Sequence, residues 1–484
     1  MSPEATRGVP SALKKGDEIA LKIESLAYGG QGVSHFHGLT IFVERSLPGQ
    51  TVLARIYKKK KSFAEAYPLQ VIEKAPNEID APCPHFGICG GCRIQNLAYE
   101  DQLSIKSQQV DDLLQRIGGF EGVEIPLAMA SPDAFHYRNK MEFTFTGRPW
   151  RVNLEDHQTE FGLGLHVPGR FDKIVNIQTC LLQNDDMNAI LKFTGQWAEE
   201  NDWEPYDLKD HVGWARNLIL RRGTHTGDLM VNLVTSTYEE SLVKPYAAAI
   251  TEQFQSVTTI VNNVTTRRAG VSVGEQEFVL YGPGFIQDKL GEHTFDIASN
   301  AFFQTNTRQA ERLYAEALEK AELKGDEIVY DLYCGTGTIS LFLAEKAKEV
   351  YGFELISEAV TNARENAKRL GIENAKFILG DLADLFHPEK ERPDIPSADV
   401  IVVDPPRAGL HPRVVKEIIR VAPERVVYVS CNPSTLARDL QLLCEEHYDL
   451  VGVQPVDMFP HTTHIESVVA LKLKSKVPEG EDVL

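Results

Sequence analysis

The sequence predicts an α/β protein whose C-terminal part is an open, mostly parallel, Rossmann-like sheet, preceded by a small β-barrel and a central α+β region. Three observations predict this fold. The chain has 484 residues, enough for about three domains. Strands and helices alternate from about residue 325 onward, as is typical of a parallel sheet. Before residue 75 the strands are short and separated by glycine turns, which favours a small barrel.

The composition is that of an ordinary globular protein, with 43% hydrophobic and 25% charged residues. A formal net charge of −19 argues against wholesale electrostatic capture of nucleic acid or of an anionic membrane. Seven cysteines are too few for a disulfide-rich secreted scaffold, and the N-terminus lacks the pattern of a signal peptide. No apolar run reaches the roughly 18 residues of a membrane span. We therefore expect a cytoplasmic enzyme that has no membrane partner.

The first predicted domain, residues 12–74, has short strands at 19–23, 40–43 and 52–56 and a turn at Tyr28-Gly29-Gly30-Gln31-Gly32. Ten lysines and arginines stand against six aspartates and glutamates in this segment, which gives it a net charge of +4 within an acidic protein. A basic barrel of this size fits an RNA-binding module. The alternative is a solvated hairpin tip at Lys58 to Lys61, and the sequence does not decide between the two.

The second predicted domain, residues 75–290, opens with a cysteine-rich stretch at 82–92. A helix follows in which Val110, Leu113, Leu114 and Ile117 share one face, and Gly118-Gly119 ends it. Mixed strands and helices come next, with strand character at 141–145, 218–222, 229–234 and 259–264.

The third predicted domain, residues 291–475, contains the strand–helix alternation. Strands are expected at 327–332, 350–354, 375–379, 399–404, 426–430, 450–455 and 467–473. Helices are expected at 339–348 and 357–370, the second ended by Gly371. The prolines and charges of 388–397 predict an exposed loop, and the last ten residues are expected to fray.

A cofactor site is predicted where the first three of these strands end. The first runs into Asp331-Leu332-Tyr333-Cys334-Gly335-Thr336-Gly337-Thr338, a glycine turn that lets the backbone approach a ligand. The second ends in Glu354, which could accept hydrogen bonds from both ribose hydroxyls, and the third in Gly380-Asp381, near an adenine edge. A dinucleotide site would have glycine at the position of Ser340. The pattern therefore favours S-adenosylmethionine over NAD.

The fourth strand ends in Asp404-Pro405-Pro406-Arg407, a rigid, extended loop beside the cofactor. Loops of this kind that end in an aromatic residue hold exocyclic amines for direct methyl transfer. Because Arg407 stands where that aromatic would be, the amine-methylation interpretation is weakened.

The reacting residues are predicted on the last strands. Cys431 ends the fifth strand just before a helix N-terminus, where the helix dipole favours a thiolate. Glu466 borders the last strand and is a candidate general base. His461 and His464 have metal-like spacing but no accompanying ligand set, and we expect them to shape their loop. One cysteine, one base and one methyl donor suit methylation of uracil C5, which becomes nucleophilic only after a thiolate adds to C6.

Four further cysteines form a second candidate site, Cys83, Cys89, Cys92 and the distant Cys180. Four thiolates can hold either zinc or an iron–sulfur cluster. Three clustered cysteines and one remote cysteine fit a cubane better than the paired spacing of a zinc site, although zinc stays open on spacing alone.

These residues together resemble the RNA (uracil-C5)-methyltransferase family over residues 12–473, most closely its 23S ribosomal RNA members, which carry an N-terminal TRAM domain and a [4Fe–4S] cluster. The most specific matches are Ser430-Cys431-Asn432-Pro433, the segment 461–466 and the cysteine spacing. The resemblance implies a TRAM RNA-binding barrel at 12–74, a central domain with the cluster motif at 75–290 and a class I methyltransferase domain at 291–475. It also implies that a [4Fe–4S] cluster is held by Cys83, Cys89, Cys92 and Cys180.

The same resemblance makes Cys431 the nucleophile and Glu466 the base that removes the C5 proton. It assigns contacts with S-adenosylmethionine to Gln304, Tyr333, Thr338, Glu354, Asp381 and Asp404, although the family often has asparagine at the positions of Thr338 and Asp381.

Three hypotheses follow from this resemblance. The leading one is a monomeric 23S ribosomal RNA uracil-5 methyltransferase. The second is a transfer RNA uridine-54-type enzyme, and the third is an iron–sulfur RNA-binding factor without catalysis. The presence of both Cys431 and Glu466 argues against the third.

Overall fold

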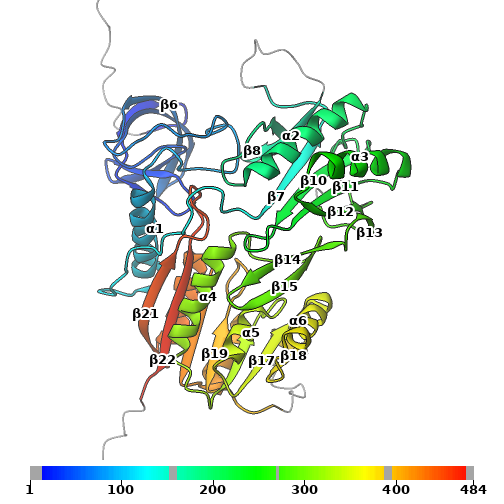
Figure 1. The fold of residues 1–484 in the computed structure, drawn as a ribbon. Helices are drawn as coiled ribbons and strands as arrows, with labels where there is room; N and C mark the ends of the chain where they lie inside the picture. Colours follow the sequence, from blue (N-terminus) through cyan, green and yellow to red (C-terminus); the bar gives the residue numbers. More distant parts are fainter. Residues whose placement is uncertain (1–12, 152–160, 269–271, 386–394, 476–484) are drawn as a thin grey trace, which may run out of the picture.

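The computed structural model describes residues 13–151, 161–268, 272–385 and 395–475. Three large sheets and one two-stranded hairpin make up its framework (Figure 1). Among the described residues, no helix is both long and apolar enough to cross a membrane. The loop predicted at 388–397 lies mostly outside the described residues, as do the last nine residues of the chain.

The N-terminal sheet has six strands. In spatial order they are β1 (Glu18–Lys22), β5 (Thr51–Lys59), β6 (Phe63–Glu73), β4 (Leu39–Val43), β3 (Gly32–Phe36) and β2 (Ser25–Leu26). Polar and apolar residues alternate along these strands, so that one face buries Ile41, Val43, Val52 and Ala54 in a small core. The three strands predicted here are confirmed, each within one to three residues at its ends.

A helix links this sheet to the rest of the molecule. α1 (Tyr99–Leu113) continues into the π-helical turn η1 (Leu114–Gly118), and Gly119 ends it with a left-handed φ of 72°. Val110 and Leu114 are buried as predicted, but Ile117 is 40% exposed. The prediction that Ile117 shares this face is wrong, because Ile117 lies within the π turn, whose wider winding moves its side chain off the α-helical face.

The central sheet is mostly antiparallel. In spatial order its strands are β13 (Gln276–Tyr281), β12 (Val257–Val264), β11 (Leu229–Thr235), β10 (Ala215–Arg222), β7 (Lys140–Thr146), β8 (Gly162–Val167) and β9 (Arg170–Asn176). Helices α2 (Asp185–Glu200) and α3 (Glu240–Gln253) cover its apolar face. The four strands predicted in this region are confirmed. A hairpin, β14 (Phe285–Leu290) with β15 (His293–Ala298), follows, and its turn contains the boundary predicted between residues 290 and 291.

The C-terminal sheet carries the predicted strand–helix alternation. In spatial order its strands are β18 (Ala375–Leu379), β17 (Glu349–Glu354), β16 (Ile328–Leu332), β19 (Val400–Val403), β20 (Arg425–Ser430), β22 (Glu466–Leu473) and β21 (Tyr448–Val456). The first five run parallel, and β22 is antiparallel to both of its neighbours. This sheet confirms the predicted Rossmann-like α/β class.

Helices cover both faces of the C-terminal sheet. One face packs on α4 (Thr307–Ala321), α5 (Thr338–Ala344) and α6 (Ser357–Leu370), and the other packs on α8 (Pro412–Val421), α9 (Pro433–Cys444) and α1. The short helix α7 (Leu382–Leu385) follows β18. The helix predicted at 339–348 is shorter than expected, because the chain turns after Ala344 so that the N–H of Lys348 can bond to the carbonyl of Glu327.

Candidate active site

The turn after β16 brings the backbone close to any ligand at the carboxyl edge of the sheet. Gly335 and Gly337 have φ values of 56° and 81°. A Cβ at Gly337 would lie 2.8 Å from the ring of Phe377, so only glycine fits there. Tyr333 also has a left-handed φ, of 69°, which costs a non-glycine residue about 1–3 kcal/mol. Such strain at the end of a central strand is typical of a ligand-binding turn.

Glu354 is held rigidly beside this turn. Its Oε2 accepts a hydrogen bond from Gly335 N at 3.0 Å, and its Oε1 accepts bonds from Leu355 N and Ile356 N at 2.8 and 2.9 Å. Asp381 follows the neighbouring strand and accepts a bond from Ala383 N at 2.8 Å. The two carboxylates therefore lie where the sequence predicts them, at the ends of adjacent parallel strands.

Two further carboxyl groups, the buried Asp331 and the half-buried Asp404, lie on and just after the neighbouring strands β16 and β19. Burial raises the pKa of Asp331 to about 7, and the nearby Asp404 adds to the shift. Asp331 accepts a 2.5 Å bond from the hydroxyl of Ser340, the residue that replaces the third glycine of a dinucleotide fingerprint. Burial also raises the pKa of Asp404 to about 7, so that both carboxyls can be neutral near physiological pH.

Gln304 and Thr338 complete the predicted cofactor residues. The backbone carbonyl of Gln304 accepts a 2.9 Å bond from Asn139 Nδ2 of the central region, and its side chain hydrogen-bonds to Tyr314. Thr338 is the first residue of α5, with its hydroxyl 3.4 Å from that of Thr336. Tyr314, which the sequence did not single out, is buried on α4, and its pKa is raised by burial and by Asp404.

The candidate nucleophile and base lie at the ends of neighbouring strands. Cys431 follows β20, and Glu466 begins β22. The antiparallel register ends where Ser430 pairs with Ser467. Cys431 and Glu466 are the residues next to this pair, Cys431 after Ser430 and Glu466 before Ser467. Both residues therefore stand at the same end of these two strands. The charge of Glu466 raises the pKa of Cys431, which places the two groups in one electrostatic environment.

The thiol does not have the lowered pKa expected from its place before α9. Burial, Glu466 and Asp404 raise the pKa of Cys431 to about 11, and Arg407 lowers it only in part. The prediction that the helix dipole favours the thiolate is therefore corrected. In the free protein the neutral thiol of Cys431 is favoured, because two carboxyl groups and desolvation outweigh one arginine. Burial and Asp404 likewise raise the pKa of Glu466 to about 8.

Arg407 brings a positive charge that lowers the pKa values of both Cys431 and Glu466. Its Nη2 lies 3.1 Å from Nδ1 of His464, and its carbonyl accepts bonds from the Asn432 amide and the Thr435 hydroxyl. The Asp-Pro-Pro-Arg loop is therefore tied directly to the start of α9. Burial lowers the pKa of His464 to about 4, so this imidazole is neutral.

The loop that leads to Glu466 is held by a buried ion pair. Lys106 Nζ of α1 lies 2.6 Å from Asp457 Oδ1 and donates to the carbonyl of Phe459 at 3.2 Å. Both charged side chains are at most 1% exposed. Breaking the pair would leave an uncompensated charge in the dry interior. The pair therefore holds the loop in its path.

His461 anchors the same loop as the sequence suggested. It has a left-handed φ of 67°, its ring stacks on Phe135 at 4.2 Å, and Gln102 bonds to both its N–H and its Nδ1. Its carbonyl accepts bonds from Arg93 N and Ile94 N at 2.8 and 3.2 Å. The loop that carries the candidate base is therefore joined to the segment immediately after Cys92.

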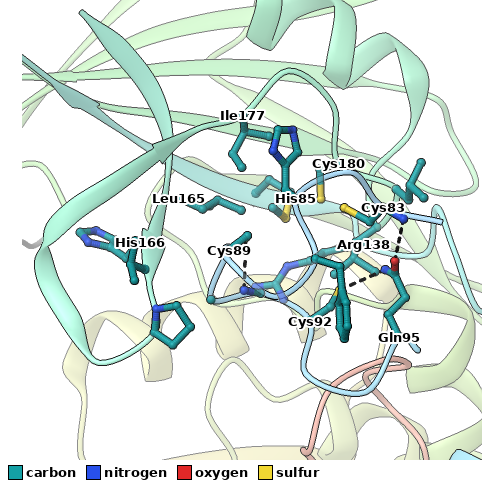
Figure 2. A pocket seen from close by; sticks show the side chains of 18 of the residues that line it. Cys83, His85, Cys89, Cys92, Gln95, Arg138, Leu165, His166, Ile177 and Cys180 are labelled. Carbon is teal, nitrogen blue, oxygen red and sulfur yellow. Dashed lines mark hydrogen bonds between the residues drawn. The ribbon is translucent and has the colours of Figure 1, made fainter. Parts of the chain in front are cut away.

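The four predicted cysteine ligands line one pocket of about 380 Å³, three from the loop before α1 and Cys180 from the segment after β9 (Figure 2). Burial raises the pKa of Cys89 to about 11, with further increases from Cys180 and Cys83. Gly91 N donates to Cys89 Sγ, and Gln95 Nε2 donates to Cys92 Sγ. Among the described residues, no three His, Cys, Asp or Glu side chains come close enough together to hold a single metal ion.

The basic segment of the N-terminal sheet lies at the β5–β6 hairpin. Lys58 pairs with Glu65 at 2.7 Å and lies over the ring of Phe63. Lys59 donates to the carbonyl of Lys60. Lys60 and Lys61 are exposed at the tip. Lys59, Lys60 and Lys61 thus expose their charge to solvent, while Glu65 partly neutralises Lys58.

Comparisons with known proteins agree with this architecture. The profile of the tRNA (Uracil-5-)-methyltransferase family matches residues 223–474. An uncharacterized RNA methyltransferase of Chlorobaculum tepidum is 41% identical over 95% of this chain and 97% of its own length. Another, from Halalkalibacterium halodurans, is 39% identical over 96% of this chain and 98% of its own length.

A solved structure is similar over nearly the whole chain. It is the Pyrococcus abyssi tRNA (uracil-54, C5)-methyltransferase in complex with S-adenosyl-L-homocysteine. Its sequence is 31% identical, the match covers 94% of this chain and all of that chain, and the TM-score is 0.72.

Proposed function

This chain belongs to the tRNA (uracil-5-)-methyltransferase family, and we propose that it methylates uridine C5 in 23S ribosomal RNA through a covalent bond between Cys431 and C6 of the base. It is an RNA (uracil-5) methyltransferase that depends on S-adenosylmethionine. The finer parts of the proposal are the mechanism, the residues and the target RNA.

One observation carries the mechanism. Cys431 and Glu466 are consecutive cross-strand neighbours beyond the last pair of β20 and β22, on the edge of the sheet where Glu354 and Asp404 also lie. A nucleophile and a base at the same end of two neighbouring strands can reach the same pyrimidine ring, one at C6 and the other at C5. Open α/β sheets bind their ligands at this edge.

The proposed reaction conserves atoms and charge. The Cys431 thiol loses its proton and its sulfur adds to C6, which makes C5 an enolate carbon. S-adenosylmethionine, when bound, would supply the methyl group: C5 would form a carbon–carbon bond to it as the sulfonium sulfur–methyl bond breaks, leaving S-adenosylhomocysteine. Glu466 then removes the proton from C5, the C6–sulfur bond breaks, and the C5=C6 double bond returns. The net result exchanges one C5 hydrogen, released as a proton, for a methyl group.

The residues of the sheet edge divide the remaining tasks. Glu354, already fixed by three backbone N–H groups, would bind the ribose hydroxyls of the methyl donor. Asp381, Tyr333, Thr338 and Gln304 would contact its other parts. Asp404 lies close enough to both reacting residues to raise the pKa values of Cys431 and Glu466, and it would also contact the donor. A neutral Asp404 could donate a hydrogen bond as well as accept one.

We also propose that Cys83, Cys89, Cys92 and Cys180 hold a [4Fe–4S] cluster. The donor set fits, because four thiols line one pocket and two of the sulfurs accept hydrogen bonds from nearby N–H groups, as cluster ligands do. Bound iron would stabilise the thiolate forms that burial opposes in the free protein. A cubane holds its thiolates farther apart than one zinc ion does, which favours the cluster. Its role would be structural or RNA-positioning, because the methyl transfer moves no net electrons.

The choice of 23S ribosomal RNA rests on the likeness of residues 12–74 to a TRAM RNA-binding domain and on the cluster motif. In this proposal the chain acts as a cytoplasmic monomer. The central and catalytic domains would occupy residues 75–290 and 291–475. A transfer RNA uridine-54-type activity is the second candidate, since the similar solved structure is an enzyme of that kind.

The decisive experiment maps 5-methyluridine in ribosomal and transfer RNA from cells with the gene, without it, and with Cys431→Ala in its place. The proposal expects one or more positions in 23S ribosomal RNA to lose the mark in both altered strains. Loss only from transfer RNA would support the second candidate. A mark that survives in the Cys431→Ala strain would overturn the covalent mechanism.

A further inference from the structure

The N-terminal sheet reaches into the active site through a single tyrosine. Tyr28 lies in the turn after β2, and its hydroxyl donates to the carbonyl of Cys431 at 3.4 Å. The residues are 403 positions apart in the sequence. Its ring packs against the hydrophobic cluster between the C-terminal sheet and α1, α8 and α9. A residue of the small basic sheet thus touches the backbone of the candidate nucleophile.

The turn that carries Tyr28 is held from several directions. Ala27 N donates to the carbonyl of Gln31 at 2.8 Å, and Gly30 N donates to that of Ala27 at 2.9 Å. Gln109 Nε2 of α1 donates to the carbonyls of Leu26 and Ala27. These bonds make the position of Tyr28 a fixed feature of the fold, because each removes freedom from a short glycine-rich loop.

The same turn also packs directly on the loop of the candidate base. Gly30 has a φ of 89°, and a Cβ at this position would lie 2.5 Å from Cγ2 of Thr463. Only glycine satisfies both the backbone conformation and the close approach. One face of the turn thus meets the segment leading to Glu466, while Tyr28 meets Cys431.

The carbonyl of Cys431 needs a donor from outside its own helix. Asn432 is the N-cap of α9, and its carbonyl accepts the first helical bond, from Leu436 N. The residue before an N-cap lies outside the helical hydrogen-bond pattern. The Tyr28 hydroxyl therefore donates to this carbonyl a hydrogen bond that the patterns of β20 and α9 do not supply.

We propose that Tyr28 is a positioning residue of the active site, whose hydroxyl holds the Cys431 carbonyl and so aims the thiol at uracil C6. This inference rests on the proposed function and adds a role for the N-terminal sheet beyond RNA binding. Burial raises the pKa of Tyr28, Arg407 lowers it in part, and Cys431 and Glu466 raise it further, which agrees with a hydroxyl beside these groups. A 3.4 Å bond is long, and catalytic hydrogen bonds often tighten only once substrate is bound.

The test compares the full-length protein with Tyr28→Phe, which removes only the hydroxyl, and Tyr28→Ala, which also removes the ring. Tyr448→Phe is the control, because the Tyr448 hydroxyl of β21 also donates to backbone carbonyls at 3.4 Å, those of Ile418 on α8 and of Pro423 just after it. Two readouts are needed. One is the rate of denaturant-stable adduct formation on 5-fluorouridine transcripts at saturating RNA and S-adenosylmethionine. The other is RNA affinity.

Tyr28→Phe and Tyr28→Ala should both slow the saturated adduct rate by about tenfold, with RNA affinity unchanged, and Tyr448→Phe should leave both readouts at the wild-type value. A wild-type rate in Tyr28→Phe would overturn the inference. So would a slower rate explained entirely by weaker RNA binding.

A third readout separates this inference from the proposed function. Alkylation of Cys431 by iodoacetamide, followed on its own peptide by mass spectrometry, needs no RNA. If the wild type forms no adduct, the proposed function fails. The alkylation rate then still tests whether the Tyr28 hydroxyl positions the Cys431 thiol. The account expects Tyr28→Phe to change that rate by severalfold relative to wild type and to Tyr448→Phe. Equal rates in all three proteins would overturn it.

Discussion

Cys431 follows Ser430, and Glu466 precedes Ser467, at the pair that ends the antiparallel register of β20 and β22. The order of strands explains why such distant residues meet. The last strand of the chain inserts between β20 and β21, and it brings the glutamate beside the cysteine that closes the fifth parallel strand. The juxtaposition is a consequence of sheet topology.

The rate of thiol chemistry at Cys431 should rise steeply with pH. Its pKa is raised to about 11, so below pH 10 each added pH unit should increase the thiolate, and the alkylation rate of the free protein, about tenfold. Glu466→Gln removes a negative charge that raises this pKa. The variant should therefore react faster than wild type at pH 9, where Glu466, with a pKa of about 8, is mostly ionised.

Iodoacetamide alkylation of the Cys431 peptide between pH 7 and 10.5 measures both effects. Glu445→Gln, just after the end of α9, is the control, because it removes one negative charge from an exposed position. If the alkylation rate of the wild type titrated with a midpoint near pH 8.5, about the ordinary pKa of a thiol, the raised pKa of Cys431 would be contradicted.

Breaking the buried ion pair should destabilise the protein strongly. Lys106→Met leaves Asp457 charged and unpaired in a dry interior, and we expect a loss of about 3–5 kcal/mol in the free energy of unfolding. Lys106→Met combined with Asp457→Asn should recover part of the loss, because the orphaned charge is gone. Lys244→Met, which breaks an exposed pair with Glu240, should cost far less, because solvent screens that pair.

Denaturant unfolding measures these changes. Equal losses for Lys106→Met and Lys244→Met would show that the buried pair does not hold the catalytic loop.

Removing one of the four pocket cysteines should abolish iron binding. Protein purified without oxygen should contain iron and acid-labile sulfide in equal amounts, with the broad visible absorbance of a cluster. Cys180→Ala should lose both, whereas Cys444→Ala, which changes a cysteine at the end of α9, should keep them. Zinc in place of iron in the wild type, retained under anaerobic purification, would favour the alternative left open by the cysteine spacing.

The lysines at the β5–β6 tip should contribute to RNA binding by charge alone. Replacing Lys59, Lys60 and Lys61 with Ser should weaken binding and make the salt dependence of affinity shallower, by up to roughly 0.7 per lysine in the log–log slope on single-stranded RNA. Lys58 is excluded because Glu65 already neutralises it in part. A matched control replaces three exposed lysines elsewhere, Lys244, Lys346 and Lys348, with Ser.

Affinity measured by filter binding across salt concentrations gives both slopes. Identical slopes for the two triple variants would mean that the tip is only a solvated hairpin.

Much of the catalytic sheet could be predicted from the sequence because its signals are local. Apolar runs ending in Asp, Glu or glycine mark the strands, and the glycine turn marks the cofactor edge without any knowledge of packing. The same local reasoning placed Cys431 and Glu466 near one edge. It failed for Ile117, where a π turn changes the helical phase, and for the Cys431 thiol, where burial and neighbouring carboxyls outweigh the helix terminus.

The residues that sequence reasoning missed share a different property. Tyr28 reaches the site from the turn after β2, 403 positions from Cys431, and Tyr314 reaches it from α4, 90 positions from Asp404. No spacing or motif distinguishes these tyrosines from others in the sequence. Their roles follow from tertiary contacts, and only the Tyr28-Gly29-Gly30 turn gave a local hint, through its two glycines.

The most direct test uses Glu466→Gln with unmodified RNA and S-adenosylmethionine. Without its base, the variant should transfer the methyl group but fail to remove the C5 proton, so that protein and RNA remain joined. Digestion and mass spectrometry should find a methylated uridine nucleotide on the peptide containing Cys431. An adduct on any other residue, or methylated RNA released freely with no adduct, would contradict the account.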